Sequence, residues 1–480
     1  MYHRVDPEFK HKLLKNIASE TLKLCYQCGT CTATCPVAHF IDIYRPDKIL
    51  HLAKLGIRDL PFSNAVLLCS ACTSCTKRCP QGVKVHSVMH ALKELWVEEG
   101  QAEKFVASNF ERILTALREE IPIPVIYSWV ALSPASGESK RSKFDDIVIN
   151  VLRRSLDNSK RAALPLPRTR PEKIAVIGSG PAGLTVAWEL NRLGFPVTIF
   201  EALLVPGGML RAGIPEFRLP KEVVAAEIQR IRDLGVIIKA GTPVGKDAFN
   251  NLLREYKAVF IATGAPVSRK LCVEGEEMEG VVPALELLRQ YNLKGQAKVG
   301  RRTVVIGGGN VAMDAARTAL RSGAESVQLF CLESRKEMPG HDWEIEEAAR
   351  EKVMINPSWG PKKMLGNNGK VTGVEFVRCR SVFDEKKRFN PSFDDATTKT
   401  IEADTVISAI GQASDLLFLD NKIGVARGVI TIDPLTMQTN LPAVFAGGDA
   451  VSGTASIIEA LVAGRVAAAS IARYLDGKKA

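Results

Sequence analysis

Two cysteine runs with the same internal spacing constrain this chain more than any other feature of its sequence. The first run reads C-x2-C-x2-C-x3-C-P and comprises Cys25, Cys28, Cys31 and Cys35. The second repeats the pattern with every cysteine shifted by 44 residues, and comprises Cys69, Cys72, Cys75 and Cys79. Thiolates are soft ligands that suit zinc and iron–sulfur clusters. The repeat therefore predicts a metal-binding module in residues 1–100.

Zinc sites and disulfides are the alternatives to clusters for these cysteines. Zinc sites use paired C-x2-C units, without a third cysteine two residues on and without a closing proline. Disulfides need an oxidising compartment, which usually accompanies a secretory signal. Residues 1–15 are charged and polar and lack the apolar region of an export signal. We therefore expect a cytoplasmic protein and favour iron–sulfur clusters.

The spacing is similar to that of bacterial ferredoxins, in which three thiolates of a run bind one 4Fe–4S cluster and the fourth binds the other. This resemblance implies one cluster on Cys25, Cys28, Cys31 and Cys79, and a second on Cys69, Cys72, Cys75 and Cys35. The long segment between the runs and the helical periodicity of Asp47–Leu55 and Val85–Glu99 predict an α-helical ferredoxin. Two neighbouring clusters conduct single electrons, so we expect electron transfer.

Length and composition describe an ordinary globular protein with room for about three domains. The chain has 480 residues, of which 46% are hydrophobic and 24% charged. It contains no stretch of 18 uncharged apolar residues, so we predict no membrane span. The formal charge is +11, but the basic residues are scattered and only 6% of residues are aromatic. We expect no nucleic-acid partner. A basic docking face for an acidic redox protein is an alternative to an ordinary solvated surface.

A dinucleotide-binding motif begins after the short apolar strand Lys173–Ile177 and precedes an apolar helix, Leu184–Leu193. Its glycines permit a tight turn, close approach of backbone N–H groups to a pyrophosphate, and packing of the helix on the strand. The next strand ends at Glu201, where a carboxylate can accept a hydrogen bond from a ribose 2′-OH. The candidate cofactor-binding residues of the turn are Gly178, Gly180, Pro181, Ala182 and Gly183.

A second copy of the motif follows the strand Thr303–Ile306 and precedes the helix Met313–Leu320. Its candidate residues are Gly307, Gly309, Asn310, Val311 and Ala312. Two such units in one chain are typical of enzymes that bring a nicotinamide onto a flavin, with FAD in the first and NAD(P)H in the second.

The FAD-type sequence resumes at Ala409-Ile-Gly-Gln412 and Phe445-Ala-Gly-Gly-Asp449, so the second unit is inserted into the first. We predict an α/β fold of two nested Rossmann-like domains behind an N-terminal all-α domain. The predicted parts are the ferredoxin domain 1–100, a helical segment (including Phe105–Leu117) with a proline-rich linker in 101–170, an FAD-binding domain in 171–280 and 409–480, and an NAD(H)-binding domain in 281–408.

Residues from about 172 onward resemble the small subunit of glutamate synthase, the large subunit of NADH-dependent ferredoxin:NADP oxidoreductase and the flavin region of dihydropyrimidine dehydrogenase. The block Gly207–Lys221 is typical of that group. The resemblance implies FAD contacts by Gly207, Gly208, Met209, Ala262, Thr263, Gly264, Gly411, Gly448, Asp449, Ala455 and Ser456. A helix that starts near Ala455 would direct its positive end at the flavin. The first 100 residues resemble instead the C subunit of heterodisulfide reductase.

The end of the second Rossmann strand carries Leu332 and Glu333, where NADPH-using members of the family place two arginines. A carboxylate suits the free 2′-OH of NADH and repels a phosphate, so we expect NAD(H), although Arg335 and Lys336 could restore NADP(H) binding. The remaining cysteines are isolated in sequence, which excludes a thioredoxin-reductase-like dithiol, and we expect them to be buried apolar residues. They are Cys272, Cys331 and Cys379.

These features predict an NADH-linked iron–sulfur flavoprotein subunit that exchanges electrons with a catalytic partner subunit or a ferredoxin, as in anaerobic metabolism. No acid–base residue is assigned, because the chemistry belongs to the flavin. Alternatives are the NADPH-dependent small subunit of glutamate synthase, a flavin-based electron-bifurcating subunit, and an adaptor whose flavin domain is only structural.

Overall fold

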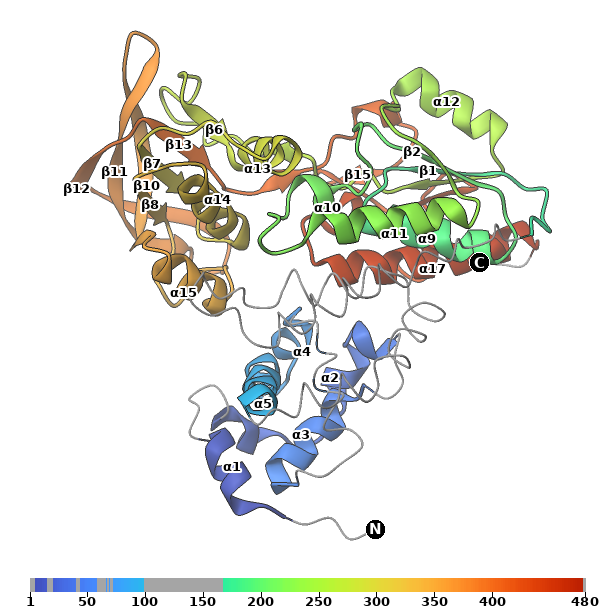
Figure 1. The fold of residues 1–480 in the computed structure, drawn as a ribbon, viewed down its shortest axis with the longest axis horizontal. Helices are drawn as coiled ribbons and strands as arrows, with labels where there is room; N and C mark the ends of the chain where they lie inside the picture. The colour runs from blue at the N-terminus through green and yellow to red at the C-terminus, as the bar shows by residue number, and fades with distance from the viewer. Residues whose placement is uncertain are drawn as a thin grey trace.

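The computed structural model describes residues 5–14, 20–39, 44–57, 66, 69, 72–98 and 167–477. The helix expected at 105–117 lies outside these residues. Figure 1 shows two α/β units side by side, with the helices of the cysteine module (residues 5–98) beneath them. We call residues 171–280 with 409–477 the first unit and residues 281–408 the second unit.

The cysteine module is helical in its described residues and contains no strand there beyond an isolated bridge between Val5 and Ile57. This agrees with the expected α-helical ferredoxin. Its elements are α1 (Pro7–Leu14), α2 (Thr30–Ala33), α3 (Pro46–Leu55), α4 (Ser74–Lys77), α5 (Val85–Glu98) and 3-10 turns at Glu20–Leu24 and Val37–His39.

The sequence repeat of the module is also a repeat of backbone conformation. Gly29 and Thr73 each follow the second cysteine of a run, and their φ angles are +76° and +60°. Each residue begins a one-turn helix that carries the third cysteine, α2 or α4. A left-handed threonine is strained, so the surrounding structure must hold it. The shared geometry gives the second and third cysteines of both runs the same backbone path.

The first unit is built on a parallel sheet in the order β17-β4-β1-β2-β3. Its strands are β1 (Ile174–Ile177), β2 (Val197–Phe200), β3 (Ile237–Lys239), β4 (Ala258–Ile261) and β17 (Val444–Ala446). Buried residues alternate between the two faces of β1: Ile174 and Val176 pack beneath α9 (Pro181–Arg192), α11 (Lys221–Asp233) and α17 (Ile457–Leu475), and Ala175 and Ile177 beneath α12 (Lys246–Glu255). These helices cover opposite faces of the sheet (Figure 1).

The second unit has its own parallel sheet, in the order β6-β13-β7-β8-β9. The strands are β6 (Val281–Pro283), β7 (Arg302–Ile306), β8 (Ser326–Cys331), β9 (Met354–Pro357) and β13 (Thr405–Ser408). One face is covered by α13 (Ala284–Lys294), α14 (Asn310–Arg321) and α15 (Asp342–Arg350). An antiparallel sheet covers the other and packs through Phe376 on Phe330, with ring centroids 4.0 Å apart. Its strands are β10 (Trp359–Asn367), β11 (Lys370–Phe383) and β12 (Phe389–Glu402).

The chain passes between the units twice, at β5 (Val267–Ser268) and β14 (Gln412–Ala413), which pair antiparallel. Sheet membership thus supports the proposed insertion of 281–408 into the first unit. The first unit is completed by α10 (Met209–Ala212), α16 (Asp449–Ser452), the 3-10 turn Leu417–Leu419, β15 (Val425–Ala426) and β16 (Val429–Ile430).

Both motif helices begin three residues earlier than expected from the sequence. The helix expected from Leu184 starts at Pro181, and the one expected from Met313 starts at Asn310. Proline is favoured in the first turn of a helix, where its missing N–H needs no partner. The earlier start puts the helix N-terminus directly at each glycine turn.

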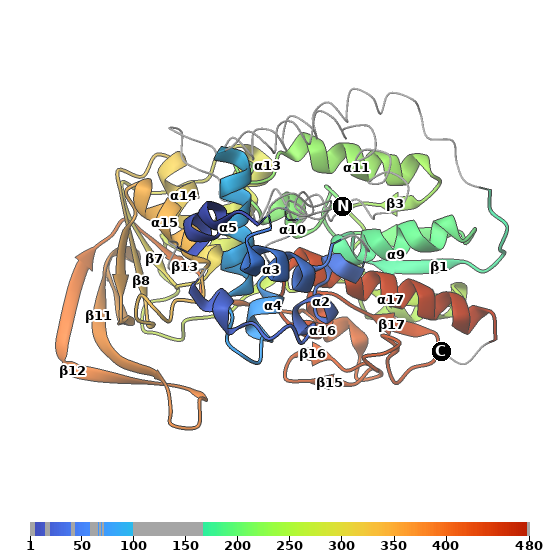
Figure 2. The same ribbon diagram turned by 90° about the horizontal axis from the view of Figure 1, so that it is seen from below.

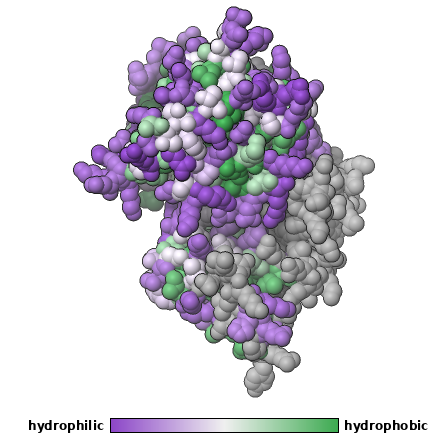
Figure 3. All heavy atoms as spheres, turned by 90° about the vertical axis from the view of Figure 1, so that its left-hand side faces the viewer, coloured by the Kyte–Doolittle hydropathy of each residue, from purple (hydrophilic) through white to green (hydrophobic). Residues whose placement is uncertain are grey.

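The face formed by the antiparallel sheet is largely hydrophilic (Figure 3). Figure 3 views the side formed by the antiparallel sheet and shows only small hydrophobic groups among polar ones. None of the helices in the described ranges has the length and apolarity that a membrane span needs.

The cysteine module contacts the first unit and lies near the second. Cys72 packs against the core of the first unit. Burial lowers the pKa of His86 of α5, and His90 and His341, which precedes α15 in the second unit, lower it further. Figure 2, seen from below, places α5 across the second unit and α2 across the first. The module therefore lies at the junction of the two units.

We expect acid to weaken this junction through His341. Burial, Arg218 and Lys77 lower the pKa of His341 to about 4, against an opposing effect of Asp342. The unfolded chain, with a histidine pKa of about 6.5, binds more protons between these values, so stability falls as the pH drops, by up to ~1.4 kcal/mol per unit. Urea unfolding at pH 7, 6 and 5 measures the free energy of unfolding. This free energy should fall less steeply with decreasing pH in His341→Asn than in the wild type. Equal slopes would contradict this, and the exposed His51→Asn variant is the control.

Candidate functional site

A cavity of about 920 Å³ opens along the carboxyl ends of the first sheet and reaches the second unit. Val311 and Asp314 of α14 line it together with residues of the first unit. Of the candidate FAD residues, those that line it are Gly178, Gly180, Pro181, Ala182, Glu201, Gly208, Met209, Ala262, Thr263, Gly264, Gly448, Asp449, Ala455 and Ser456. Its size suits a large ligand rather than a few waters.

Glycines shape one end of the cavity. A Cβ on Gly178, whose φ is +101°, would lie 2.3 Å from the carbonyl oxygen of Ala262. A Cβ on Gly208 would lie 2.9 Å from the Cα of Gly180, while Gly180 itself faces open space. The N-terminus of α9 meets this open space, so its free N–H groups and its dipole favour an anion there. These residues fit the pyrophosphate of a dinucleotide.

Glu201 is held in place at the end of β2 and is only 6% exposed. Its Oε2 accepts hydrogen bonds from the backbone N of Ser179 (2.9 Å) and from Ser179 Oγ (2.5 Å), and its Oε1 accepts from Leu203 N (2.8 Å). Ser179 Oγ in turn accepts from Gly207 N at 2.8 Å. Ser179 was missed by the sequence analysis, because the middle residue of the motif is not specified by its pattern. Through these hydrogen bonds, Ser179 connects the glycine turn to Glu201 and to the backbone at Gly207.

The other end of the cavity has two polar side chains, Thr263 and Asp449, that a bound cofactor could contact. Thr263 Oγ1 is buried without a hydrogen-bond partner among the described residues. Burial raises the pKa of Asp449 to about 6, while Ala455 N donates to its Oδ1 at 3.3 Å. Ser456 caps α17 reciprocally with Glu459, so two of the N–H groups at this helix start are already bonded. An extended cofactor would satisfy the orphan hydroxyl and contact the remaining positive end of α17.

Three candidate FAD residues lie outside the cavity lining: Gly183, Gly207 and Gly411. Gly183 has the packing role expected from the motif, since a Cβ there would lie 2.1 Å from the carbonyl oxygen of Gly178. Gly207 and Gly411 have φ angles of +123° and +113°, which let the chain turn. Their contribution is to backbone shape.

The second glycine turn repeats the geometry of the first. A Cβ on Gly307 would lie 2.4 Å from the carbonyl oxygen of Ala409, and one on Gly308 would lie 3.0 Å from Glu333 Oε2. The candidate residues of the second motif that lie outside the cavity lining are Gly307, Gly309, Asn310, Ala312, Glu333 and Arg335. Arg335 forms an ion pair with Asp342 at 3.3 Å. A carboxylate over a glycine turn is the arrangement that suits a ribose hydroxyl.

The cysteines fall into two groups that mix the runs. Cys25, Cys28 and Cys31 of the first run line one pocket with Cys79 of the second. Cys35 and Cys75 are buried, which raises their thiol pKa values, and Cys69 and Cys72 raise them further. This is the crossed grouping that the ferredoxin resemblance implies.

The thiols of Cys25, Cys28, Cys31 and Cys79 lie around a small pocket. No three or more His, Cys, Asp or Glu side chains within the described ranges are arranged to hold a single metal ion. A zinc ion draws its thiolates to about 2.3 Å. A cluster of several irons and sulfides spreads its ligands more widely, and an all-cysteine donor set suits it.

The isolated cysteines do not all behave as expected. Cys331 and Cys379 are buried, but Cys272 is exposed. Cys272 has a φ of +58° in a surface turn, where its N–H donates to Glu276. The expectation of burial is wrong for Cys272, because isolation in sequence does not reveal the position of a turn.

Residues 172–469 match the family model of pyridine nucleotide-disulphide oxidoreductases, and residues 21–83 match that of a 4Fe-4S dicluster domain. The chain resembles in fold the FprA protein of Mycobacterium tuberculosis, solved with NADPH, with a TM-score of 0.56, 20% identity and coverage of 64% of this chain and 85% of that one.

Curated relatives include subunits of several oxidoreductases. The chain is 37% identical to the beta subunit of an NADP(+)-dependent formate dehydrogenase of Moorella thermoacetica, over 83% of this chain but only 59% of that subunit. It is 33% identical to the beta subunit of an NADPH-Fe(3+) oxidoreductase of Geobacter sulfurreducens, over 95% of this chain and 71% of that subunit. It is 36% identical to the NADPH glutamate synthase small chain of Azospirillum brasilense, over 64% of this chain and 67% of that small chain. The expected fusion of an iron–sulfur module with a glutamate-synthase-type oxidoreductase is confirmed.

Glu201→Ala should lower FAD occupancy. The change removes the proposed acceptor for a ribose hydroxyl and leaves two buried donors of Ser179 and the partly buried N–H of Leu203 without their partner. Losing one hydrogen bond to a charged group weakens binding by ~1.5–3 kcal/mol, or roughly tenfold or more. The flavin-to-protein ratio after purification and the dissociation constant on reconstitution measure the effect. Glu255→Ala, at an exposed carboxylate, should retain full flavin; equal flavin in both variants would contradict the role of Glu201.

Proposed function

Because the chain belongs to the pyridine nucleotide-disulphide oxidoreductase family, we propose that it is the NADH-linked electron-transfer subunit of a larger oxidoreductase. Hydride passes between NAD(H) and FAD, and single electrons pass through two 4Fe–4S clusters to or from a partner subunit or a ferredoxin. The family and the dicluster domain make the chain an NAD(P)H-dependent flavin and iron–sulfur oxidoreductase. The preference for NADH, the two clusters and the partner are the proposed details.

The observation that carries the proposal is the cavity shared by the two units. Val311 and Asp314, which follow the second glycine turn, line the same space as Gly180 and Thr263 of the first unit. Hydride transfer requires that the nicotinamide and the flavin meet face to face. A cavity that both nucleotide motifs reach supports this meeting.

In this proposal, the residues of the chain bind the cofactor and orient it. The turn at Gly180 and the N-terminus of α9 hold a pyrophosphate, and Glu201 holds the ribose beyond it. Thr263, Asp449 and the start of α17 contact the opposite end. The apolar lining, including Leu285 and Leu288 of α13, excludes water from the reacting end.

Burial of the cysteines supports an order for the clusters. Cys35, Cys69 and Cys75 are buried, and Cys72 of the same group packs on the core of the first unit. In the other group Cys28 is exposed, beside Tyr26, whose side chain is 59% exposed. The Cys72 group is therefore proposed as the cluster nearer the flavin, and the Cys28 group as the one that faces the partner.

The partner is proposed from the relatives. Two of them are named as beta subunits and one as a small chain. The similarity to the formate dehydrogenase subunit extends over 83% of this chain, against 64% for the glutamate synthase chain. A catalytic subunit of the former kind is the first candidate, and the small-subunit role in glutamate synthesis is the second.

Two double variants test the function and the crossed ligand sets together. Cys25→Ala with Cys79→Ala removes two ligands of one proposed cluster, whereas Cys25→Ala with Cys35→Ala removes one ligand of each. The first should keep about half of roughly eight irons, and the second should lose more. Iron assays and electron paramagnetic resonance of the anaerobic protein measure this. NADH should still reduce bound FAD in both, while reduction of a ferredoxin acceptor is lost.

The opposite iron pattern would contradict the crossed ligand sets. The proposed function itself fails if NADH does not reduce the flavin of the wild-type protein, or if that protein contains no iron. Flavin content, which should be equal in the two variants, controls for folding.

The proposed preference for NADH rests on Glu333. Its Oε2 lies over the second glycine turn, 3.0 Å from where a Cβ of Gly308 would be. Arg335, the nearest candidate for phosphate binding, is already paired with Asp342. The relatives named above specify NADP(H), so this chain's carboxylate would mark a difference from them.

We expect the wild type to favour NADH over NADPH in kcat/KM, and Glu333→Ala to reduce the ratio by about tenfold, which corresponds to ~1.4 kcal/mol of like-charge repulsion. Flavin reduction by each nucleotide in stopped-flow measures it. Glu346→Ala removes an exposed carboxylate of α15 and should leave the ratio unchanged. A wild type that prefers NADPH would overturn the assignment.

A further inference from the structure

Asp314 has a carboxylate oxygen that the protein does not satisfy. The residue lies in α14 and is 6% exposed, and Arg218 Nη1 donates to its Oδ2 at 2.6 Å. Its other oxygen, Oδ1, is buried and has no hydrogen-bond partner among the described residues. Asp314 lines the shared cavity. A buried charged oxygen without a donor is costly, which points to a ligand that supplies one.

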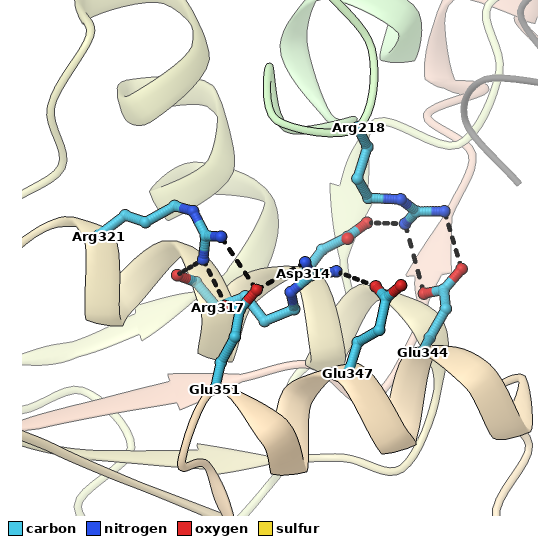
Figure 4. A network of polar contacts seen from close by, with 7 residues as sticks. All are labelled: Arg218, Asp314, Arg317, Arg321, Glu344, Glu347 and Glu351. Atoms are coloured by element: carbon cyan, nitrogen blue, oxygen red, sulfur yellow. Dashed lines mark hydrogen bonds and ion pairs between the residues drawn. The ribbon is translucent and has the colours of Figure 1, made fainter. Parts of the chain in front are cut away.

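The orientation of Asp314 is fixed from outside its own unit. Arg218 follows α10 in the first unit, is 7% exposed, and donates through Nη2 to Glu344 Oε1 of α15 at 2.8 Å. Figure 4 shows this guanidinium between Asp314 and Glu344. Because Arg218 holds Oδ2, the side chain cannot turn Oδ1 away without breaking a buried ion pair.

The place of Asp314 along α14 indicates which part of a dinucleotide it meets. The helix starts at Asn310, at the turn that suits a pyrophosphate, and Glu333 lies on the side that suits the adenosine ribose. Asp314 is one turn further along α14 and faces the cavity that also contains the flavin residues. The half of the dinucleotide that extends there is the nicotinamide half.

We propose that Asp314 Oδ1 accepts a hydrogen bond from the carboxamide NH₂ of the nicotinamide and so orients the ring toward the flavin. The inference rests on the proposed function and names a binding residue for it. The carboxamide NH₂ is the donor group of the nicotinamide ring, and a carboxylate oxygen is the acceptor that suits it. Arg218 acts through Asp314 and is a positioning residue.

The test compares NADH with reduced 3-acetylpyridine adenine dinucleotide, in which a methyl group replaces the carboxamide NH₂. The holoprotein is used, and kcat and KM for flavin reduction are measured for both nucleotides. A site that hydrogen-bonds a donor rejects an analogue lacking it, so the wild type should favour NADH in kcat/KM by about tenfold or more. In Asp314→Asn, the carbonyl oxygen keeps Arg218, and the NH₂ that replaces Oδ1 cannot accept. This variant should lose most of the preference.

Glu347→Gln is the matched control. Glu347 is a buried carboxylate of α15 that pairs with Arg317 of α14 at 2.8 Å, in the same network but outside the cavity lining. It should keep the wild-type preference, because a purely structural change affects both nucleotides alike. Flavin content and the unfolding midpoint are measured in each variant.

The inference is overturned if Asp314→Asn keeps the wild-type preference, if the wild type has none, or if Asp314→Asn loses flavin while keeping the preference, which would make Asp314 a flavin contact. Failure of the proposed function looks different, since NADH would then fail to reduce the flavin of the wild type at all.

Discussion

The relative position of the two nucleotide units depends on a buried guanidinium. Arg218 comes from the first unit and binds carboxylates of α14 and α15 in the second, all three side chains being less than one-tenth exposed. Such a pair stabilises little, because desolvation offsets most of the attraction, but losing one partner strands a charge and costs ~3–5 kcal/mol. The interaction therefore specifies one arrangement of the units. The preceding residue, Phe217, supports it by packing under Arg317 and Arg321.

This arrangement creates the cavity in which the chemistry is proposed to occur. The first glycine turn and Glu201 define one wall, and α14 brings Val311 and Asp314 to the other. Each Rossmann unit alone would present its turn to solvent. Hydride transfer needs both, so the ion pairs of Figure 4 position the reaction although they need not touch the reacting atoms.

The cysteine module also has a fixed backbone frame, and this frame holds the proposed cluster ligands. The left-handed residues Gly29 and Thr73 give both runs one backbone path, and the crossed groups bind the runs into one body. One group lies against the first unit and the other reaches the surface at Cys28. This graded exposure supports the proposed electron route between the cavity and the surface.

The sequence by itself determined the features that depend on local spacing. The cysteine runs indicated the crossed grouping, and the glycine turns indicated two Rossmann units, because turns and ligand loops need particular residues at particular offsets. Most of the candidate FAD residues that it named line the cavity. Helix starts were three residues late, since the start depends on where the turn closes. Only the tertiary structure decided the roles of Ser179, Arg218 and Asp314 and the exposure of Cys272. These depend on contacts between segments up to 126 residues apart, such as Arg218 with Glu344, which no local pattern encodes.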